Sequence, residues 1–235
     1  MGFERVAAAK QSTNGFSDFS KTVSNYDTDV FRPLFDELER LSGKTYSSSL
    51  PEGPKRSEQE AVDIAFRVIG DHLRALSFSI ADGIMPGNSD RNYVLRRILR
   101  RAIRYGRNLG FSEPFFHKLV GALVEQIGDV FPELKDRQEL IEKTLRSEEE
   151  SFNKTLDRGI ELFRRESEQL GDKKEISGEF AFRLYDTYGF PLDLTQLMAR
   201  VRSLSADEEG FNLEFEKRRT SAREGYKIVR RQGRR

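Results

Sequence analysis

The stretch at residues 57–81 reads SEQEAVDIAFRVIGDHLRALSFSIA and predicts a long helix. Ser57 and Glu60 have the spacing of a capping box, in which each side chain satisfies a free backbone amide at the start of a helix. Apolar residues then recur at helical spacing to about Ala81. The same spacing runs through nearly the whole chain, whereas alternating apolar and polar runs are hard to find. The sequence therefore predicts a nearly all-α protein.

Further helices are expected on both sides of this stretch. Upstream, one begins at Asp27 or Thr28 and ends at Ser42, where Gly43 reaches the left-handed conformation at little cost. Downstream of the 57–81 helix, residues 82–91 are expected to form a loop rich in glycine and proline. A second capping box, Ser205 and Glu208, is expected to open the last helix. The other predicted helices cover residues 92–109, 113–130, 132–170, 177–189, 193–204 and 207–227.

The composition excludes several classes of protein and site. The 235 residues are 37% hydrophobic, enough for one large or two ordinary domains. Because 40 Lys+Arg balance 39 Asp+Glu, bulk charge alone cannot bind a polyanion. The absence of cysteine and the presence of only two histidines exclude disulfides, thiolate catalysis and a Cys/His zinc site within this chain. Without a long apolar run or a signal-peptide pattern, a soluble cytoplasmic protein is expected.

Residues 91–107 carry the most informative charge pattern. The segment contains no acidic residue and seven arginines, namely Arg91, Arg96, Arg97, Arg100, Arg101, Arg104 and Arg107. On a helix with about 100° per residue, the last six fall within an arc of about 140°. Such a face is self-repelling unless something anionic lies on it. Phosphate is the obvious candidate, since a guanidinium donates bidentately to its oxygens.

Two interpretations of this arginine face remain open. Either it binds a nucleic-acid backbone, or acids on neighbouring helices, for example Glu58, Glu60 and Asp63, neutralise it inside the fold. If the face binds a nucleic-acid backbone, other residues must recognise the bases, and Asn88 lies in the loop just before this helix. Its amide can read a base edge, but an Asn at this place more often caps a helix or stabilises a turn. Asp193, which follows Pro191, poses the same choice.

Two longer stretches resemble the tRNA-recognition region of the alanyl-tRNA synthetase family. The first, at residues 80–102, contains IADGIMP, then Asn88, then RNYVLRRILRRA; the second, at residues 182–195, reads FRLYDTYGFPLDLT. The resemblance extends through residues 25–34 and 58–79. At the start, MGFER resembles the end of motif 3 of class II synthetases. Asn92 stands where the family usually has glycine, and we expect it to keep a left-handed turn there.

The resemblance implies a domain organisation. Residues 1–24 would be a remnant of the catalytic domain, the end of motif 3 with a loop. Residues 25–229 would form the helical tRNA-recognition domain, allowing a division into two subdomains near residues 130–175. Residues 230–235 would be a disordered basic tail.

The resemblance also implies site residues. Enzymes of this family use ATP to activate alanine and transfer it to a tRNA that they select by a G·U wobble pair in the acceptor stem. Asn88 and Asp193 would read that pair, each offering an oxygen to the unpartnered guanine 2-amino group. Gly2 and Arg5 would belong to motif 3, where the arginine contacts ATP phosphate. The residues expected to hold backbone phosphates, some of them turned inward, are Arg91, Arg96, Arg97, Arg100, Arg101 and Arg104.

By this resemblance the chain acts as part of a ligase and is catalytically inactive alone. We expect no catalytic residue, metal or cofactor in it, whereas the full enzyme uses ATP and Mg²⁺, with zinc a further candidate in its editing region. Its expected partners are the tRNA(Ala) acceptor stem and the catalytic and editing domains, and not a membrane. Two alternatives are a helical scaffold between domains that binds no RNA, and a self-sufficient ligase, against which the missing catalytic sheet argues.

Overall fold

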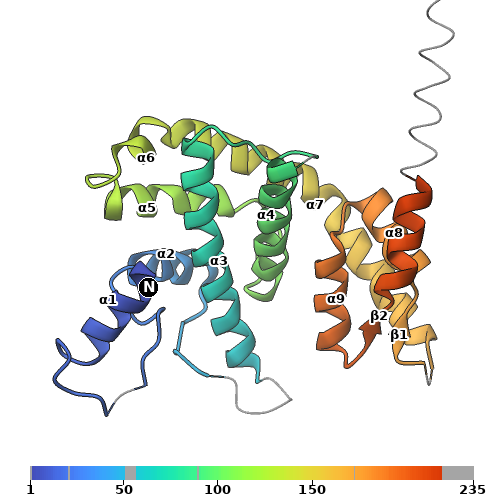
Figure 1. The fold of residues 1–235 in the computed structure, drawn as a ribbon, viewed down its shortest axis with the longest axis horizontal. Coiled ribbons are helices and arrows are strands. Elements are labelled where there is room, and N and C mark those ends of the chain that lie inside the picture. The colour runs from blue at the N-terminus through green and yellow to red at the C-terminus, as the bar shows by residue number, and fades with distance from the viewer. Residues whose placement is uncertain (1, 21, 51–56, 89, 172, 219–235) are drawn as a thin grey trace, which may run out of the picture. The chain divides into compact units, whose positions relative to one another are not determined.

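The computed structural model describes residues 2–20, 22–50, 57–88, 90–171 and 173–218. Helices dominate this part of the chain, which confirms the predicted all-α class (Figure 1). The chain divides into two compact units, Met1–Asn153 and Lys154–Arg235. The basic tail at residues 230–235 and the end of the last predicted helix lie outside the described residues.

Unit 1 is built from helices joined by loops. Helix α3 runs through it, and α4 folds back alongside α3 (Figure 1). The apolar stripe of α4, which includes Leu95, Leu99, Ala102 and Ile103, is buried. The elements of this unit are α1 (Phe3–Ser12), α2 (Arg32–Ser42), α3 (Glu58–Ala81), α4 (Asp90–Asn108), the 3-10 helix η1 (Phe116–Leu119), α5 (Val120–Ile127), α6 (Pro132–Asp136) and the first half of α7 (Gln138–Gln169).

The local signals that predicted α3 and the end of α2 are confirmed. The Ser57 hydroxyl accepts from the Glu60 amide at 3.1 Å, and the Glu60 carboxylate accepts from the Ser57 amide at 2.6 Å. This capping box opens α3, which ends at Ala81. Gly43 ends α2 with a φ of 68°, the left-handed conformation expected of it. Short-range hydrogen bonding is therefore sufficient to place these two helix ends.

Three predicted helices differ from the structure in their limits. Helix α2 begins at Arg32 instead of Asp27 or Thr28, because Pro33 suits a first turn and a turn from Thr28 to Phe31 precedes it. The helix expected from residue 113 begins with η1 at Phe116. The helix expected over residues 132–170 breaks at Arg137, so that α6 packs on α3 with Leu134 buried.

Unit 2 contains the second half of α7, two helices, a two-stranded sheet and a helix at residues 208–218. Strands β1 (Glu175–Ile176) and β2 (Ser205–Ala206) pair in parallel. Strand β1 comes just before α8 (Gly178–Tyr188), and β2 comes just before the 208–218 helix. Helix α9 (Leu192–Val201) ends three residues earlier than expected. Strands of two residues are too short to leave an alternating pattern in the sequence.

The second capping box was predicted wrongly. Ser205 lies in β2, where its hydroxyl donates to the Lys174 carbonyl oxygen at 3.3 Å. Asp207 takes the capping role instead, since its carboxylate accepts from the Gly210 amide at 2.8 Å. A serine, an aspartate and two glutamates follow one another closely here, and strand pairing decides which of them is free to cap.

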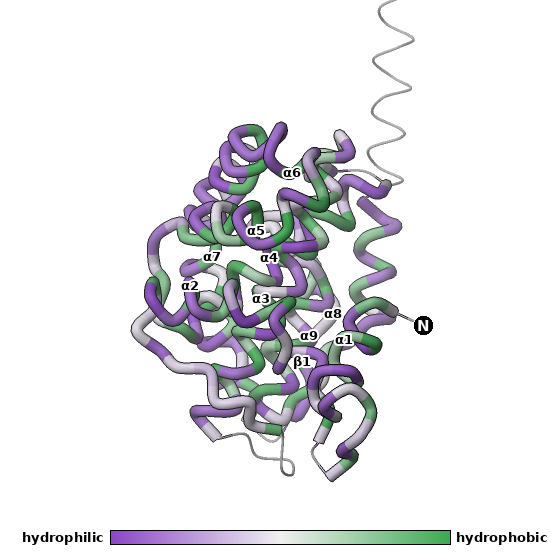
Figure 2. Tube along the Cα trace, turned by 90° about the vertical axis from the view of Figure 1, so that its left-hand side faces the viewer, coloured by the Kyte–Doolittle hydropathy of each residue, from purple (hydrophilic) through white to green (hydrophobic). Residues whose placement is uncertain are grey.

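The hydropathy of the helices alternates along the trace (Figure 2). Among the described residues, no helix combines the length and the apolar character that crossing a membrane requires. In the same part of the chain, no cluster of three or more His, Asp or Glu side chains offers a metal site.

Candidate nucleic-acid interface

The arginines of α4 divide into two groups according to what lies beside them. Those at one edge of the predicted face turn toward α7, and those at the other edge turn toward solvent. The division follows from helical spacing, because Arg96, Arg100 and Arg107 lie within about 40° of one another around the axis.

Arg96 is held by protein groups at all three of its guanidinium nitrogens. Its Nε and Nη2 donate to the two carboxylate oxygens of Glu148 in α7, at 2.9 and 2.7 Å. Its Nη1 donates to Oδ1 of Asn88. The Arg96 and Glu148 side chains are 18% and 23% exposed, so this bidentate pair is partly desolvated. Arg96 thus contacts both α7 and the α3–α4 loop, which we define as residues 82–88.

Arg100 and Arg107 also lie against α7. The Arg100 guanidinium lies 5.0 Å from the centre of the Phe152 ring. Arg107 donates to the Phe111 carbonyl oxygen at 2.5 Å and to Oδ1 of Asn153 at 3.3 Å. Both side chains therefore help to join α4 to the first half of α7.

Arg104 occupies an intermediate position. It donates to Oδ1 of Asn108 at 2.9 Å, and burial lowers the pKa of its guanidinium, with the charge of Arg107 acting in the same direction. Neighbouring Arg101 is exposed and contributes to the field around His72. Burial lowers the pKa of His72 to about 4, so this histidine is neutral at pH 7.

Arg91, Arg97 and Arg101 form the exposed arginine face of α4. None of the three has an acidic partner among the side chains that the structure describes. Val94 lies between Arg91 and Arg101 around the helix and is 42% exposed. Three exposed guanidinium groups with an apolar side chain among them are suited to a phosphate-ribose backbone.

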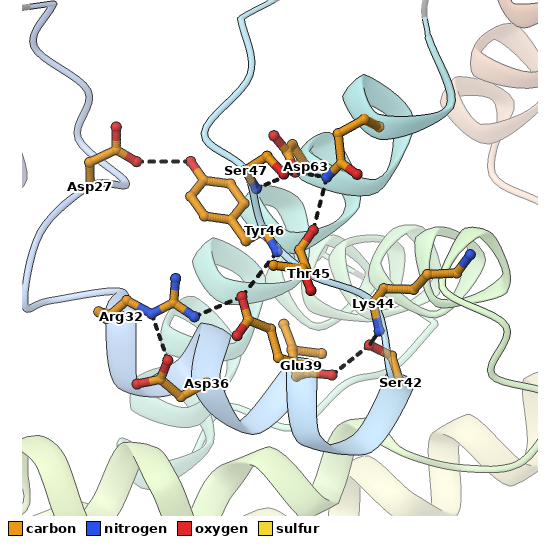
Figure 3. A network of polar contacts seen from close by, with 12 residues as sticks. Asp27, Arg32, Asp36, Glu39, Ser42, Lys44, Thr45, Tyr46, Ser47 and Asp63 are labelled. Atoms are coloured by element: carbon orange, nitrogen blue, oxygen red, sulfur yellow. Dashed lines mark hydrogen bonds and ion pairs between the residues drawn. The ribbon is translucent and has the colours of Figure 1, made fainter.

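The three acids suggested as internal partners of the arginines are occupied elsewhere. Asp63 accepts from the backbone amides of Ser47 and Ser49 at 3.0 and 2.6 Å, and the first of these bonds appears in Figure 3. Glu60 belongs to the capping box, and Glu58 lies 3.7 Å from Lys44. Internal pairing is therefore correct for Arg96, but its acid comes from α7 and not from α3.

The network in Figure 3 shows how Asp63 of α3 and acids of α2 hold the segment between these two helices. The segment after α2 is tied back to α2 by the Tyr46 amide, which donates to Glu39 at 3.0 Å. Arg32 bridges Asp36 and Glu39 on α2, at 2.6 and 2.8 Å. Together with the bonds to Asp63, these contacts fix the path of the chain between α2 and α3. They stabilise the fold on a side of α3 that does not involve the α4 arginines.

The α3–α4 loop is held in place by two contacts. The Gly87 amide donates to the Asn92 carbonyl oxygen at 2.9 Å, and a Cβ added at Gly87 would lie 2.9 Å from Cβ of Asn92. The Thr144 hydroxyl of α7 lies 3.9 Å from the sulfur of Met85. Asn92 itself is helical within α4, so the expectation of a left-handed turn at this residue is wrong. Gly87 is instead the residue whose backbone comes close to Asn92.

Asp193 lies in unit 2, in the first turn of α9. Pro191 occupies the N-cap position, and no side chain caps this helix end. Within the described part of the chain, Oδ1 of Asp193 is buried and has no hydrogen-bond partner. The capping interpretation of Asp193 is therefore not supported, and Oδ1 is a buried oxygen that the described residues leave without a hydrogen bond. Asn88 belongs to unit 1, so the two expected base readers come from different units.

Gly2 and Arg5, the residues that the resemblance assigns to motif 3, lie at the start of α1. Gly2 is the extended N-cap residue of this helix, and Arg5 is exposed on it. Glu4 forms an ion pair with Arg74 of α3 at 3.0 Å, which fixes α1 to the rest of unit 1.

Sequence reasoning missed Glu148 and Glu149. Three consecutive glutamates, residues 148–150, are typical of a solvated helix face. Yet Glu149 follows Ile141 and Leu145 at intervals of four and is fully buried with them. The helical spacing of Glu149 with these apolar residues could have predicted that its side chain is buried.

Comparisons with known proteins identify the family of this chain. The family model described as tRNA synthetases class II (A) matches residues 8–232. The alanine–tRNA ligase of Akkermansia muciniphila is 60% identical over 230 residues, covering 95% of this chain and 24% of that protein. That of Opitutus terrae is 47% identical over 250 residues, covering 97% and 27%. That of Chlorobium phaeovibrioides is 48% identical over 235 residues, covering 99% and 25%.

The chain spans about a quarter of the length of these curated relatives. The matches nevertheless cover almost all of this chain. The chain therefore belongs to the class II (A) tRNA synthetases, and the relatives that it matches in that family are alanine–tRNA ligases.

Proposed function

We propose that this chain is the part of an alanine–tRNA ligase that recognises the acceptor stem of tRNA(Ala). The observation that carries the proposal is the exposed arginine face of α4, Arg91, Arg97 and Arg101, on the same helix as Arg96, which contacts Asn88. Guanidinium groups that lack acidic partners within the described residues favour a polyanion as ligand. The names of the relatives indicate which polyanion it is.

The chemistry of a G·U wobble pair suits the groups available here. The wobble leaves the guanine 2-amino group without its usual partner in the wide, shallow minor groove of A-form RNA. Asp193 supplies a buried carboxylate oxygen with no partner in the described structure. Oδ1 of Asn88 accepts one bond from Arg96, which leaves its second lone pair and its N–H groups for a base edge. The arginine face adds affinity and register without reading sequence.

In the whole enzyme this recognition would serve the ATP- and Mg²⁺-dependent attachment of alanine in the cytoplasm. Arg5 would then act on ATP phosphate within a catalytic domain. The 235-residue chain alone is proposed to be inactive, and alanine-dependent ATP–pyrophosphate exchange by the purified chain would contradict this.

The test is a fluorescence titration of labelled acceptor-stem hairpins that carry either G·U or G·C at the recognised position. We expect the chain to prefer the G·U hairpin by about tenfold or more, and Asn88→Ala and Asp193→Ala to remove most of that preference. Asn212→Ala and Asp136→Ala replace exposed residues of the same types and should leave it unchanged. Equal affinity of the unaltered chain for both hairpins at moderate salt would contradict base-specific recognition.

One observation favours the alternative of a scaffold between domains that binds no RNA. Arg96, Arg100 and Arg107 are engaged with α7, so part of the arginine pattern has an internal use. If the chain fails to bind either hairpin at low salt, the scaffold interpretation replaces the one proposed here.

A further inference from the structure

We propose that Glu148 is a positioning residue for RNA recognition: it holds Arg96 in the orientation that fixes the side-chain amide of Asn88. This inference rests on the proposed function, because it assumes that Asn88 contacts a base. Glu148 comes from α7, 60 residues along the chain from Asn88, and no sequence motif links the two.

The first step is the geometry of the ion pair. Glu148 receives two parallel N–H bonds from Nε and Nη2 of Arg96, at 2.9 and 2.7 Å. Such a fork fixes the plane of the guanidinium, whereas a single contact would leave it free to swing. Only Nη1 points away from Glu148, and it donates to Oδ1 of Asn88. The position of this donor is therefore determined by Glu148.

The second step is the chemistry of the amide. A guanidinium has donors only, so it accepts nothing from the Asn88 N–H groups and selects the orientation with Oδ1 toward Arg96. An exposed asparagine without such a neighbour interchanges its donor and acceptor by a half rotation of the amide. Asn88 is exposed, so little else restrains it. Arg96 therefore decides which edge of the amide Asn88 presents to RNA.

Helix α7 also supports the α3–α4 loop directly. Thr144 lies one helical turn before Glu148 and contacts Met85, in the same loop as Asn88. Two residues on one face of α7 thus restrain the loop, one directly and one through Arg96. Glu148 also neutralises an arginine that would otherwise be free beside the RNA.

The key variants are Glu148→Ala and Arg96→Lys, tested in the hairpin titration. Glu148→Ala should reduce the preference for G·U over G·C about tenfold. Its affinity for the G·C hairpin should stay equal or rise, because a positive charge has been released. Arg96→Lys keeps the charge but cannot bind Glu148 through a fork and also reach Asn88, so it should lose the preference as well. A simple phosphate contact by Arg96 would survive this change.

Glu150→Ala is the matched control. Glu150 lies on the same helix, carries the same charge, is exposed and pairs with Arg146 at 2.8 Å. Its loss should raise the affinity for both hairpins alike and leave the preference intact. Circular dichroism establishes that each variant is folded, and Arg96→Lys provides the decision if Glu148→Ala does not fold.

The outcomes separate this inference from the function on which it rests. If the unaltered chain shows no G·U preference, the proposed function fails first. If the preference exists and depends on Asn88 but survives both Glu148→Ala and Arg96→Lys, the positioning role alone is overturned. If Glu148 acts through Asn88, the Asn88→Ala/Glu148→Ala double variant should lose no more preference than Asn88→Ala alone, and additive losses would contradict the role.

Discussion

Glu149 of α7 is an ionisable side chain in the interior of unit 1. It is fully buried, and its carboxylate accepts from the backbone amides of Phe115 and Phe116 at 3.1 and 3.0 Å. These amides begin the turn that leads into η1, so α7 fixes the start of that element. Burial raises the pKa of Glu149 to about 7, from an ordinary value of 4.5.

The raised pKa of Glu149 makes stability depend on pH. Because the folded state holds the proton more tightly than the unfolded state, this contribution is fully present below about pH 4.5 and is lost as the pH rises through about 7. Relative to Glu149→Gln, which does not titrate, the unfolding free energy of the unaltered protein should fall by about 2–3 kcal/mol between pH 5 and pH 8. Urea unfolding at several pH values measures this, and a constant difference would show that Glu149 is ionised throughout.

At the scale of single residues, the sequence predicted the chemistry better than the geometry. Helical spacing correctly grouped the α4 arginines on one side of the helix. It could not show that α7 passes along one edge of that group and removes Arg96 from it. Asn88 and Asp193 could be selected only by resemblance, since each residue type also caps helices.

Helix α3 allows a test at the scale of one element. Ser57→Ala removes the hydroxyl that accepts from the Glu60 amide, and it should lower the unfolding free energy by about 1 kcal/mol. The measurement is again urea unfolding. Ser151→Ala alters an exposed serine in the middle of α7 and should cause no comparable loss. Equal effects of the two changes would mean that the cap contributes nothing specific.

Helix limits were predictable where the signal was local. The capping box of α3 and the glycine after α2 depend on residues close in the sequence, and both are confirmed. The start of η1 depends on Glu149, more than 30 residues away. The capping serine expected before residue 208 is taken up by strand pairing with Lys174 and Glu175. These errors share one cause, a tertiary contact that overrides a local preference.

At the scale of the whole molecule, near-zero net charge hides a local concentration of positive charge. If the exposed arginine face of α4 binds RNA, each guanidinium in contact releases about one counterion, so affinity falls as salt rises. Arg97→Ala and Arg101→Ala should each weaken binding to both hairpins and reduce the slope of log affinity against log salt by about one. Arg40→Ala removes the same charge from α2 and should leave the slope unchanged. Identical slopes for all variants would place the RNA elsewhere.

If an acceptor stem lies against the exposed side of α4, a photo-crosslinker placed at Val94 should reach it. Val94 is 42% exposed among the exposed arginines, so replacing it with p-benzoylphenylalanine removes no charge. The same replacement at Leu50, which is 50% exposed, serves as the control. With the G·U hairpin bound, we expect cross-links to the stem from position 94 and none from position 50. Bound RNA that cross-links from neither position, or equally from both, would show that the stem does not lie against the exposed side of α4.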